Sequence, residues 1–337
     1  MNATVDLAAI RHRLTAAGAA AVRAPDADFY TLADWGITRT IMGEDLRRLP
    51  DGERLPWLAR MAAMQDPTDG SFPQFSLQSF QHSKLHGNGT AVGGIGALGG
   101  RFRHPVRLYE PFAEPARVAA WLDGAIDWSN QWSASHLFWG GMHCFACSAR
   151  AQAAWTEAVI GWLDREADPL TGWWRRGVAH ADRHQPLGGA VHILPIYQHL
   201  GRRFPHIERT IDSTLALQLP GGNWWQVRDD GVSYLELDAL YVFALGRLWA
   251  PGHRSAEVTE AIERHAALVT RDLEGHVARA LDGHAHLLLC LVGILGLHRQ
   301  LAPERFRDDR AWSDIFSDPA LYRTAAVEAR TSVANSA

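Results

Sequence analysis

A block of roughly 50 residues recurs along this chain, and it constrains the fold more than any other feature of the sequence. Each copy joins an apolar segment to a more polar segment whose apolar residues recur at helical spacing. The polar segment ends in a turn rich in glycine and aromatic residues. The apolar segments are clearest at 139–151, 187–201, 232–246 and 281–296. Repeats of this length are typical of helical hairpins that stack or close into a ring.

The two kinds of segment predict two layers of helices. Segments that are apolar on every side are expected to be buried, and the polar ones, which have a single apolar stripe, are expected to cover them. Six such hairpins, with almost no strand signals, predict an all-α fold: an (α/α)6 toroid with inner and outer helix layers. We expect one domain over 1–337, with a peripheral helix at 1–25 and a closing outer helix and tail at 305–337. The polar residues 73–89 are expected to form a long loop.

Composition argues against several classes of function. The formal net charge of −4 offers no basic surface for nucleic acid. The longest apolar run, 286–298, is too short to cross a bilayer. Three cysteines cannot make a disulfide framework, and the first residues lack the apolar core of a secretory signal. We therefore expect a cytoplasmic protein that acts on a small-molecule substrate, and the sequence leaves its oligomeric state open.

One turn carries a family motif. Residues 218–224, QLPGGNW, contain the pattern Gln-x-x-x-Gly-x-Trp. This pattern resembles the QW repeat of squalene–hopene cyclases and related terpenoid cyclases and prenyltransferases. Partial versions occur at 65–72 and 168–174. In that family the repeat ties outer helices together in an (α/α)6 barrel, so the resemblance implies the same fold and a terpenoid-cyclase-like enzyme.

The chain departs from that family at the residues of the reaction. Class II cyclases carry an Asp-x-Asp-Asp acid, whereas residues 236–239 read Glu-Leu-Asp-Ala. Glu236 is interpreted as a surface or capping residue on the other face of its helix. Protein prenyltransferases bind zinc through an Asp-x-Cys pair, which this sequence does not contain. The resemblance therefore implies the fold, and the reaction has to be argued from the residues.

Four polar residues fall at equivalent places in successive copies: His143, His192, Asp238 and His286. They are 49, 46 and 48 residues apart, within the first two turns of their predicted inner helices. A toroid would gather them around a central cavity. Imidazoles and a carboxyl group are the usual proton-transfer pair, so we assign catalysis to these four and to Tyr241, one turn after Asp238. A single buried histidine is commonly structural, but four unpaired polar groups in register would be unfavourable to bury.

The turns beside this ring supply the predicted substrate-binding residues. Aromatic side chains there would shape the pocket, or they would serve only as spacers of the repeat. Charged turns near helix N-termini suggest a substrate with a carboxylate or phosphate group, or they would be ordinary solvated turns. The predicted set is Trp139, Trp173, Trp174, Trp225, Tyr234, His86, Asn88, Arg176, Arg228 and Cys147.

No cofactor is assigned, and a divalent metal is the main alternative for the ring. Three imidazoles and a carboxylate at His143, His192, Asp238 and His286 would suit zinc. Cys147, one turn beyond His143, is a further candidate as a nucleophile or as a buried structural thiol.

The sequence leaves three hypotheses about function. The leading one is a cyclase, isomerase or lyase that uses acid/base proton transfer on a small apolar or amphipathic substrate. The second is a carbohydrate-active enzyme of the same fold, which would present aromatic faces across an open cleft. The third is a non-catalytic helical scaffold, which would fill the ring with side chains and leave no pocket near Asp238.

Overall fold

The computed structural model describes residues 4–77 and 80–329 of the chain. This part is mainly helical, which confirms the all-α prediction. Its strands are two residues long: β1 (Val5–Asp6) pairs in parallel with β4 (Phe306–Arg307), and β2 (Ser76–Leu77) pairs antiparallel with β3 (Phe80–Gln81). No helix in the described ranges has both the length and the apolar character that a bilayer crossing requires.

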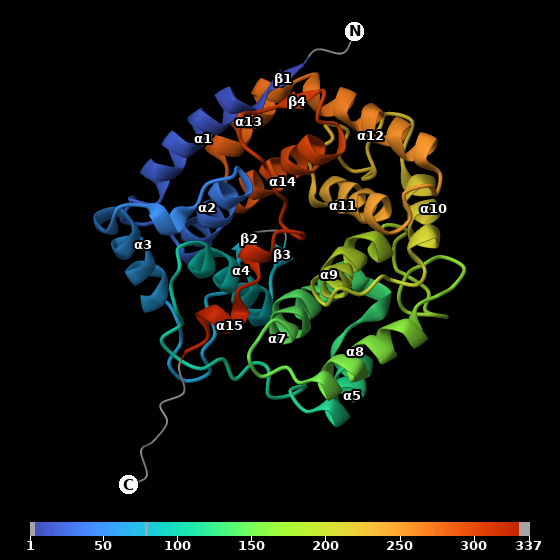
Figure 1. Cartoon of the computed structure of the whole chain (residues 1–337), viewed down its shortest axis with the longest axis horizontal. Helices are drawn as coiled ribbons and strands as arrows, with labels where there is room; N and C mark the ends of the chain where they lie inside the picture. Colours follow the sequence, from blue (N-terminus) through green and yellow to red (C-terminus); the bar gives the residue numbers. More distant parts are fainter. Residues whose placement is uncertain (1–3, 78–79, 330–337) are drawn as a thin grey trace.

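An inner layer is formed by apolar segments that contact one another in a closed circuit (Figure 1). In chain order these are α2 (Phe29–Ile41), α4 (Lys84–Ala97), the π-helix η3 (Phe138–His143) with α7 (Cys144–Ala146), α9 (Gln185–His199), α11 (Tyr234–Trp249) and α14 (Ala285–Leu301). Each contacts the next, and α14 returns to contact α2. These helices are apolar on almost every side, and contacts with two neighbours and with the outer layer bury them.

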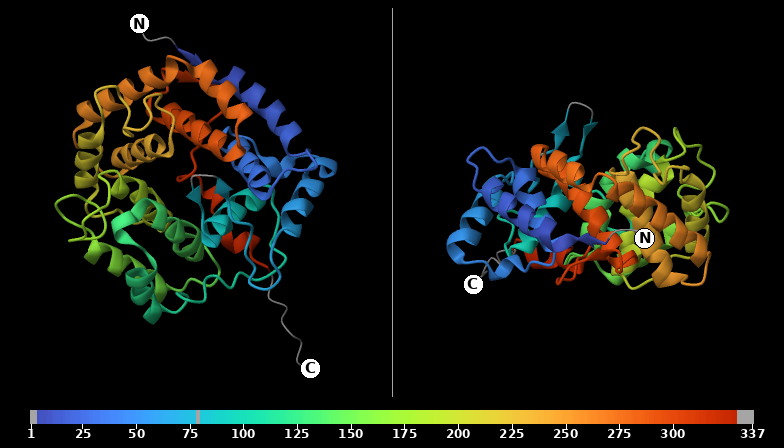
Figure 2. Two further views of the ribbon diagram at one scale, coloured as in Figure 1. Left: turned by 180° about the vertical axis from the view of Figure 1, so that it is seen from behind. Right: turned by 90° about the horizontal axis from the view of Figure 1, so that it is seen from above.

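Amphipathic helices surround this circuit (Figure 2). They are α1 (Leu7–Ala21), α3 (Asp51–Ala63), α5 (Pro115–Ala125), α8 (Ala153–Glu166), α10 (Ile207–Leu217), α12 (Ser255–Thr270) and α13 (Leu273–Asp282). Helix α10 packs on α11, and α13 packs on α14, so an outer helix covers the inner helix that follows it. Short connecting elements are η1 (Leu46–Arg48), η2 (Trp128–Asn130) and α6 (Gln131–Ala134).

Residues 305–329 do not form the predicted closing outer helix, and the rest of that predicted segment lies outside the described residues. After β4 come only two short elements, η4 (Pro319–Leu321) and α15 (Thr324–Val327), which lie against α4 on the inner layer (Figure 1). Asp318 caps η4 directly before Pro319, so the sequence here starts one short turn and not a long helix. The outer position is taken by α1, which contacts α13.

Helix α4 begins at Lys84, inside the predicted loop at 73–89. Ser83 caps it, because its Oγ accepts the backbone N–H of His86 at 3.2 Å. The glycines that weaken the helical signal here permit close packing: a Cβ on Gly89 would lie 3.1 Å from the backbone of η3. His86 therefore lies on a packed helix of the inner layer and not in a loop.

The glutamines of the motif-bearing turns tie outer segments together. Gln218 Nε2 donates to a carbonyl of its own turn and to Ala261 O on α12, both at 2.9 Å. Gln65 Nε2 donates to a carbonyl of its own turn at 2.9 Å and to His104 O at 2.8 Å. Each glutamine amide therefore fixes its own turn against a second segment of the chain.

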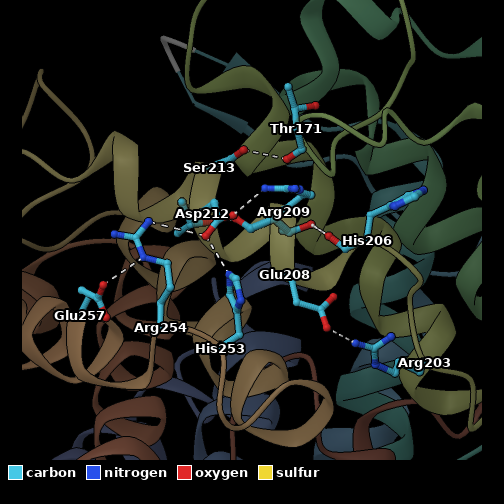
Figure 3. A network of polar contacts seen from close by, with 12 residues as sticks. Thr171, Arg203, His206, Glu208, Arg209, Asp212, Ser213, His253, Arg254 and Glu257 are labelled. Atoms are coloured by element: carbon cyan, nitrogen blue, oxygen red, sulfur yellow. Dashed lines mark hydrogen bonds and ion pairs between the residues drawn. The ribbon is translucent and has the colours of Figure 1, made fainter.

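A polar network on the outer layer joins α10 to the chain that leads into α12 (Figure 3). Asp212 lies 2.8 Å from His253 Nε2, 3.3 Å from Arg209 and 3.6 Å from Arg254. Because these side chains are partly exposed, the network is expected to order the loop and to contribute little to stability.

Candidate active site

Five histidines from separate elements meet on the inner layer, and we call them the histidine cluster. They lie directly before α4, on α4, in the turn after α6, on α9 and at the start of α14. Their ring centroids are 3.8 to 5.8 Å from those of neighbouring rings in the cluster. The members are His82, His86, His136, His192 and His286.

His82 makes the most contacts within the cluster. Its Nε2 lies 3.2 Å from Nε2 of His286, and its Nδ1 lies 3.0 Å from Nδ1 of His136. Its ring stacks on that of His86, with centroids 3.8 Å apart and an interplanar angle of 11°. Each nitrogen–nitrogen contact needs a single proton between the two atoms, so the tautomers of these three linked rings depend on one another.

Polar side chains of α2 hold two further ring nitrogens. Asp34 Oδ2 lies 2.8 Å from Nδ1 of His286, and Tyr30 Oη lies 3.2 Å from Nδ1 of His86. In both contacts the α2 side chain bonds to Nδ1, so the Nε2 atom of the same ring is not occupied by α2. A fixed tautomer and a fixed ring orientation are what a general base or a metal ligand requires.

His192 joins the cluster through His136. Their rings meet edge to face, with centroids 4.9 Å apart. Nδ1 of His192 lies 2.9 Å from Ser135 Oγ, and burial lowers the pKa of His192 to about 4. The structure therefore places this predicted residue in the cluster as a neutral imidazole.

Burial also lowers the pKa values of His82, His86 and His136. Burial, followed by the neighbouring imidazoles, lowers the pKa of His82 to about 2. The same causes place the pKa values of His86 and His136 well below the usual value for histidine. A neutral imidazole accepts a proton or binds a metal. Burial therefore favours the neutral form of these three side chains, which can bind a metal but is a weak base.

The pKa of Asp238, on α11, shifts in the opposite direction. Burial, and then the charge of Glu236, raises the pKa of Asp238 well above the usual carboxyl value. Its Oδ2 is buried and has no hydrogen-bond partner among the described residues. Burial raises the pKa of Tyr234, and nearby acidic groups that include Asp238 raise it further. The Tyr234 hydroxyl donates to His286 O at 2.6 Å, and Tyr234 lies one turn before Asp238 on α11.

The structure does not bring His143 into the cluster. His143 lies in a second group, where its Nε2 is 2.6 Å from Nδ1 of His199 and its ring stacks on Tyr322 at 4.2 Å. The cause is the π-helix η3, which takes more residues per turn than an α-helix and shifts the register of the repeat. His136, seven residues earlier, supplies the imidazole that this copy contributes to the cluster.

The other three of the four polar residues predicted around the cavity lie at different positions along their helices. His286 is the second residue of α14, Asp238 the fifth of α11 and His192 the eighth of α9. The prediction that all lie in the first two turns is wrong for His192. Helix α9 begins at Gln185, before the apolar pattern that marked it in the sequence.

Tyr241 and Trp139 have different surroundings. The Tyr241 hydroxyl donates to Gln198 Oε1 at 2.8 Å, and no described contact joins it to the cluster. Trp139 lies between the two histidine groups, with its ring 4.9 Å from that of His86. Its Nε1 donates to Tyr322 Oη, which stacks on the second group, at 3.0 Å. Trp139 is thus, with Tyr234, a predicted aromatic residue that contacts the cluster.

The turn tryptophans belong to the packing between helices. Trp174 is buried and its Nε1 donates to Leu163 O on α8 at 2.9 Å, with Trp173 buried beside it. Trp225 is partly buried and packs edge-on against Trp132, with centroids 5.9 Å apart. These described residues do not line the open cleft that a carbohydrate-active enzyme would need.

The predicted polar substrate-binding residues Arg176, Arg228 and Asn88 have no described contact with the histidine cluster. Arg176 is exposed and donates to a backbone carbonyl at the end of α8 at 3.0 Å. Arg228 pairs with Asp230 at 2.9 Å. Asn88 is buried, and its Nδ2 donates to Tyr109 Oη at 2.7 Å and to a carbonyl of η3 at 2.9 Å. Asn88 therefore ties α4 to η3.

Two groups of described residues bring three possible metal-ligand atoms within 4.8 Å of one another: His82 with His86 and His286, and His143 with Cys147 and His199. The metal set predicted from the sequence is divided, because each group contains one of its histidines and neither contains its other two residues. Burial raises the pKa of the Cys147 thiol to about 12. A protonated thiol is the weaker nucleophile.

Sequence reasoning missed four residues of the site: His82, His136, Asp34 and Tyr30. Two of these residues, His82 and Asp34, could have been identified from the sequence. His82 and His86 are four residues apart on either side of a good helix-capping serine, which predicts neighbouring side chains. Asp34 is an acid within an apolar segment, the same feature that marked Asp238.

Two described cavities lie away from the cluster. One, of about 370 Å³, is bounded by α10, α11 and the start of α12, and the other, of about 220 Å³, lies between the ends of α2 and α4 and the chain near η4. Neither is lined by a residue of the cluster or by Asp238. Asp238 is 2% exposed, and the scaffold hypothesis predicted that side chains fill the ring at this point.

No family model, curated protein or solved structure matches this chain.

Proposed function

We propose that this chain is an enzyme that transfers protons at the histidine cluster, as a cyclase, isomerase or lyase of a small apolar or amphipathic substrate. One observation carries the proposal: burial raises the pKa of Asp238 on α11, and Tyr234, one turn before it, donates to the backbone of His286 in the histidine cluster. Acid/base catalysis needs one group that gives a proton and another that accepts it. Environments that move the pKa values of neighbouring groups in opposite directions provide both.

Asp238 is the acid in this proposal. Its buried Oδ2 lacks a described partner, and an unsatisfied buried oxygen is unfavourable by about 1–3 kcal/mol. A substrate group that hydrogen-bonds to this oxygen would remove that penalty. It would also be positioned to receive the proton of the carboxyl group. The buried, apolar inner helices around Asp238 favour an apolar substrate over a charged one.

His286 is the best placed base. Asp34 accepts from its Nδ1 at 2.8 Å, and a carboxylate in that position stabilises the imidazolium that forms when Nε2 takes a proton. Trp139 and Tyr234 would shape the substrate site beside it.

We also propose that the closed circuit of inner segments is the inner layer of an (α/α)6 toroid of the terpenoid-cyclase type. Two features support this fold. Each inner segment contacts two others of the circuit, and the glutamines of the QW-like turns join neighbouring outer segments.

The test uses a panel of terpenoid alcohols and alkenes incubated with the full chain in D2O. Deuterium incorporation and new products are measured by gas chromatography with mass spectrometry. The Asp238→Asn variant keeps the size of the side chain and removes the acid, so activity is expected to fall about 10²- to 10⁴-fold. Asp212→Asn, in the surface network, is the matched control and is expected to keep full activity.

Full activity in Asp238→Asn would contradict the assignment of the acid. A folded wild-type chain that exchanges no deuterium into any member of the panel would favour the scaffold hypothesis. Thermal unfolding of both variants distinguishes a lost acid from a lost fold.

A further inference from the structure

We propose that His82, His86 and His286 bind one divalent metal ion of the zinc type. The three histidines approach from two regions far apart in the sequence: the start of α14, and α4 with the two residues before it. All three side chains are about 5% exposed. An ion bound to Nε2 of His286 would prevent that nitrogen from accepting a proton, so in the metal-bound chain the base would be His136 or His192. Metal binding is measured without a substrate, so the two proposals are tested separately.

The distances between the ring nitrogens fit a metal-binding group. One ligand atom from each histidine lies within 4.8 Å of the other two. At zinc–nitrogen distances of about 2.0–2.1 Å, two ligands of a tetrahedral site lie roughly 3.3–3.4 Å apart. The Nε2 atoms of His82 and His286 are already 3.2 Å apart. The third ligand has to move by about 1.5 Å at most to complete the face of the tetrahedron.

Each of the three rings is held through its Nδ1 atom. The partner of His286 is Asp34 Oδ2 at 2.8 Å, and that of His86 is Tyr30 Oη at 3.2 Å. His82 uses its Nδ1 to contact His136 at 3.0 Å. Metal-binding histidines commonly bond a carboxylate or another polar group through the second ring nitrogen, which fixes the ring and its tautomer. These contacts leave the Nε2 atoms of His82 and His286 facing each other. Binding of one ion by all three residues requires the His86 ring, now stacked on that of His82 at 11°, to turn toward them.

Asp34 supplies an electrostatic reason for a cation at this point. Its side chain is 1% exposed and pairs with His286, while its Oδ1 has no described hydrogen-bond partner. No arginine or lysine is paired with Asp34 among the described residues. A buried carboxylate is unfavourable without a compensating charge. A divalent ion bound to Nε2 of His286 would place a positive charge on the other side of the imidazole ring from Asp34.

The second group of possible ligands fits a metal less well. Nε2 of His143 lies only 2.6 Å from Nδ1 of His199, which is a direct hydrogen bond and is too short for two ligands of one ion. The third member, Cys147, is a protonated thiol, and its burial disfavours the thiolate that a metal requires. The geometry therefore favours the three-histidine group.

Three protein ligands leave a fourth position on the ion, as in zinc sites that bind water or substrate. His136 and His192 are the nearest imidazoles to that position. An ion here would polarise a substrate oxygen or activate a bound water.

The first experiment uses the full chain, stripped of metal with a chelator and then titrated with Zn²⁺ by calorimetry. We expect one equivalent to bind, with a rise in the midpoint of thermal unfolding, because an ion that binds the folded state stabilises it. X-ray absorption of the zinc complex is expected to show nitrogen neighbours at about 2.0–2.1 Å and no sulfur at about 2.3 Å.

Variants locate the site. His286→Gln and His86→Gln each remove one ligand and are expected to weaken zinc binding at least 100-fold. Asp34→Asn removes the contact that orients His286 and is expected to weaken binding about 10- to 100-fold. His199→Gln, in the second group, is the matched control and is expected to bind zinc as the wild type does.

Failure of the wild-type chain to bind zinc would overturn the proposal. So would a sulfur neighbour in the absorption spectrum, which would place the ion at Cys147. Wild-type affinity in a folded His286→Gln variant would also contradict it. The absorption measurement needs no variant, so the proposal can be decided even if a substituted chain does not fold.

Discussion

Glu236 holds the turn at residues 224–225 against α11 with both of its carboxylate oxygens. Oε2 accepts the N–H of Trp224 at 2.8 Å, and Oε1 accepts that of Trp225 at 3.0 Å. The prediction that Glu236 is a surface residue is wrong, because it is fully buried. It does accept backbone N–H groups, as a capping residue does, but those of the turn at 224–225. Burial raises its pKa to about 7, although the two N–H groups act in the opposite direction.

Replacing Glu236 with alanine is expected to destabilise the fold by about 2–4 kcal/mol, because two buried N–H groups lose their acceptors. Denaturant unfolding followed by circular dichroism measures this change. Glu260→Ala on the exposed face of α12 is the matched control, and a loss below about 1 kcal/mol is expected there. Equal losses in the two variants would show that Glu236 does not anchor the turn.

The contact between α4 and η3 is made by backbone against backbone. A Cβ on Gly140 would lie 1.6 Å from Leu85 O and 2.9 Å from the backbone nitrogen of His86. No side chain can be accommodated without moving one of the two elements. The position of His86 in the histidine cluster therefore depends on glycine at this point of η3.

Gly140→Ala is expected to destabilise the chain by about 3 kcal/mol or more, because the added methyl group forces the two elements apart. Gly161→Ala on α8 is the control. No heavy atom lies within 4 Å of the added Cβ there, and alanine is expected to stabilise the helix by about 0.5–1 kcal/mol. Thermal unfolding of the two variants decides the matter, and a stable Gly140→Ala chain would contradict the packing described.

The helices could be predicted from periodicity because inner and outer segments differ in which faces are apolar. The site was predicted only in part. The repeat identified His192, Asp238 and His286, but it selected His143 in place of His136, because periodicity carries no sign of a π-helix. His82 was missed because its capped helix is rich in glycine, and tertiary packing overrides that weak helical propensity.

At the scale of the whole molecule, the start of the described chain meets the segment that follows α14. β1 pairs with β4, and the buried guanidinium of Arg11 bonds to Asp308 at 2.8 Å and to Asp309 at 2.7 Å. Burial alone would raise the pKa of Asp308, but the hydrogen bond from Arg11 holds it well below the usual value. This ion pair joins α1, the first outer helix, to the segment that follows α14.

Arg11→Met is expected to lower stability by about 3–5 kcal/mol at pH 7, because it leaves a buried carboxylate without its partner. The folded-state pKa of Asp308 is depressed, so the stabilisation is present above its unfolded pKa of about 3.9 and is lost as pH falls below that value. The difference between variant and wild type should therefore shrink on acidification. Arg13→Met, which breaks an exposed pair with Glu274, is the control and should change stability by less than about 1 kcal/mol at either pH.

The central claim is that a closed circuit of inner helices gathers five imidazoles around one buried point. X-ray diffraction from crystals of the full chain tests it most directly. We predict that α14 contacts α2 and that Nε2 of His82 and of His286 lie within about 3.5 Å of each other, directly or on a shared metal ion. Imidazoles dispersed over separate surfaces, or an open circuit with α14 apart from α2, would contradict the account.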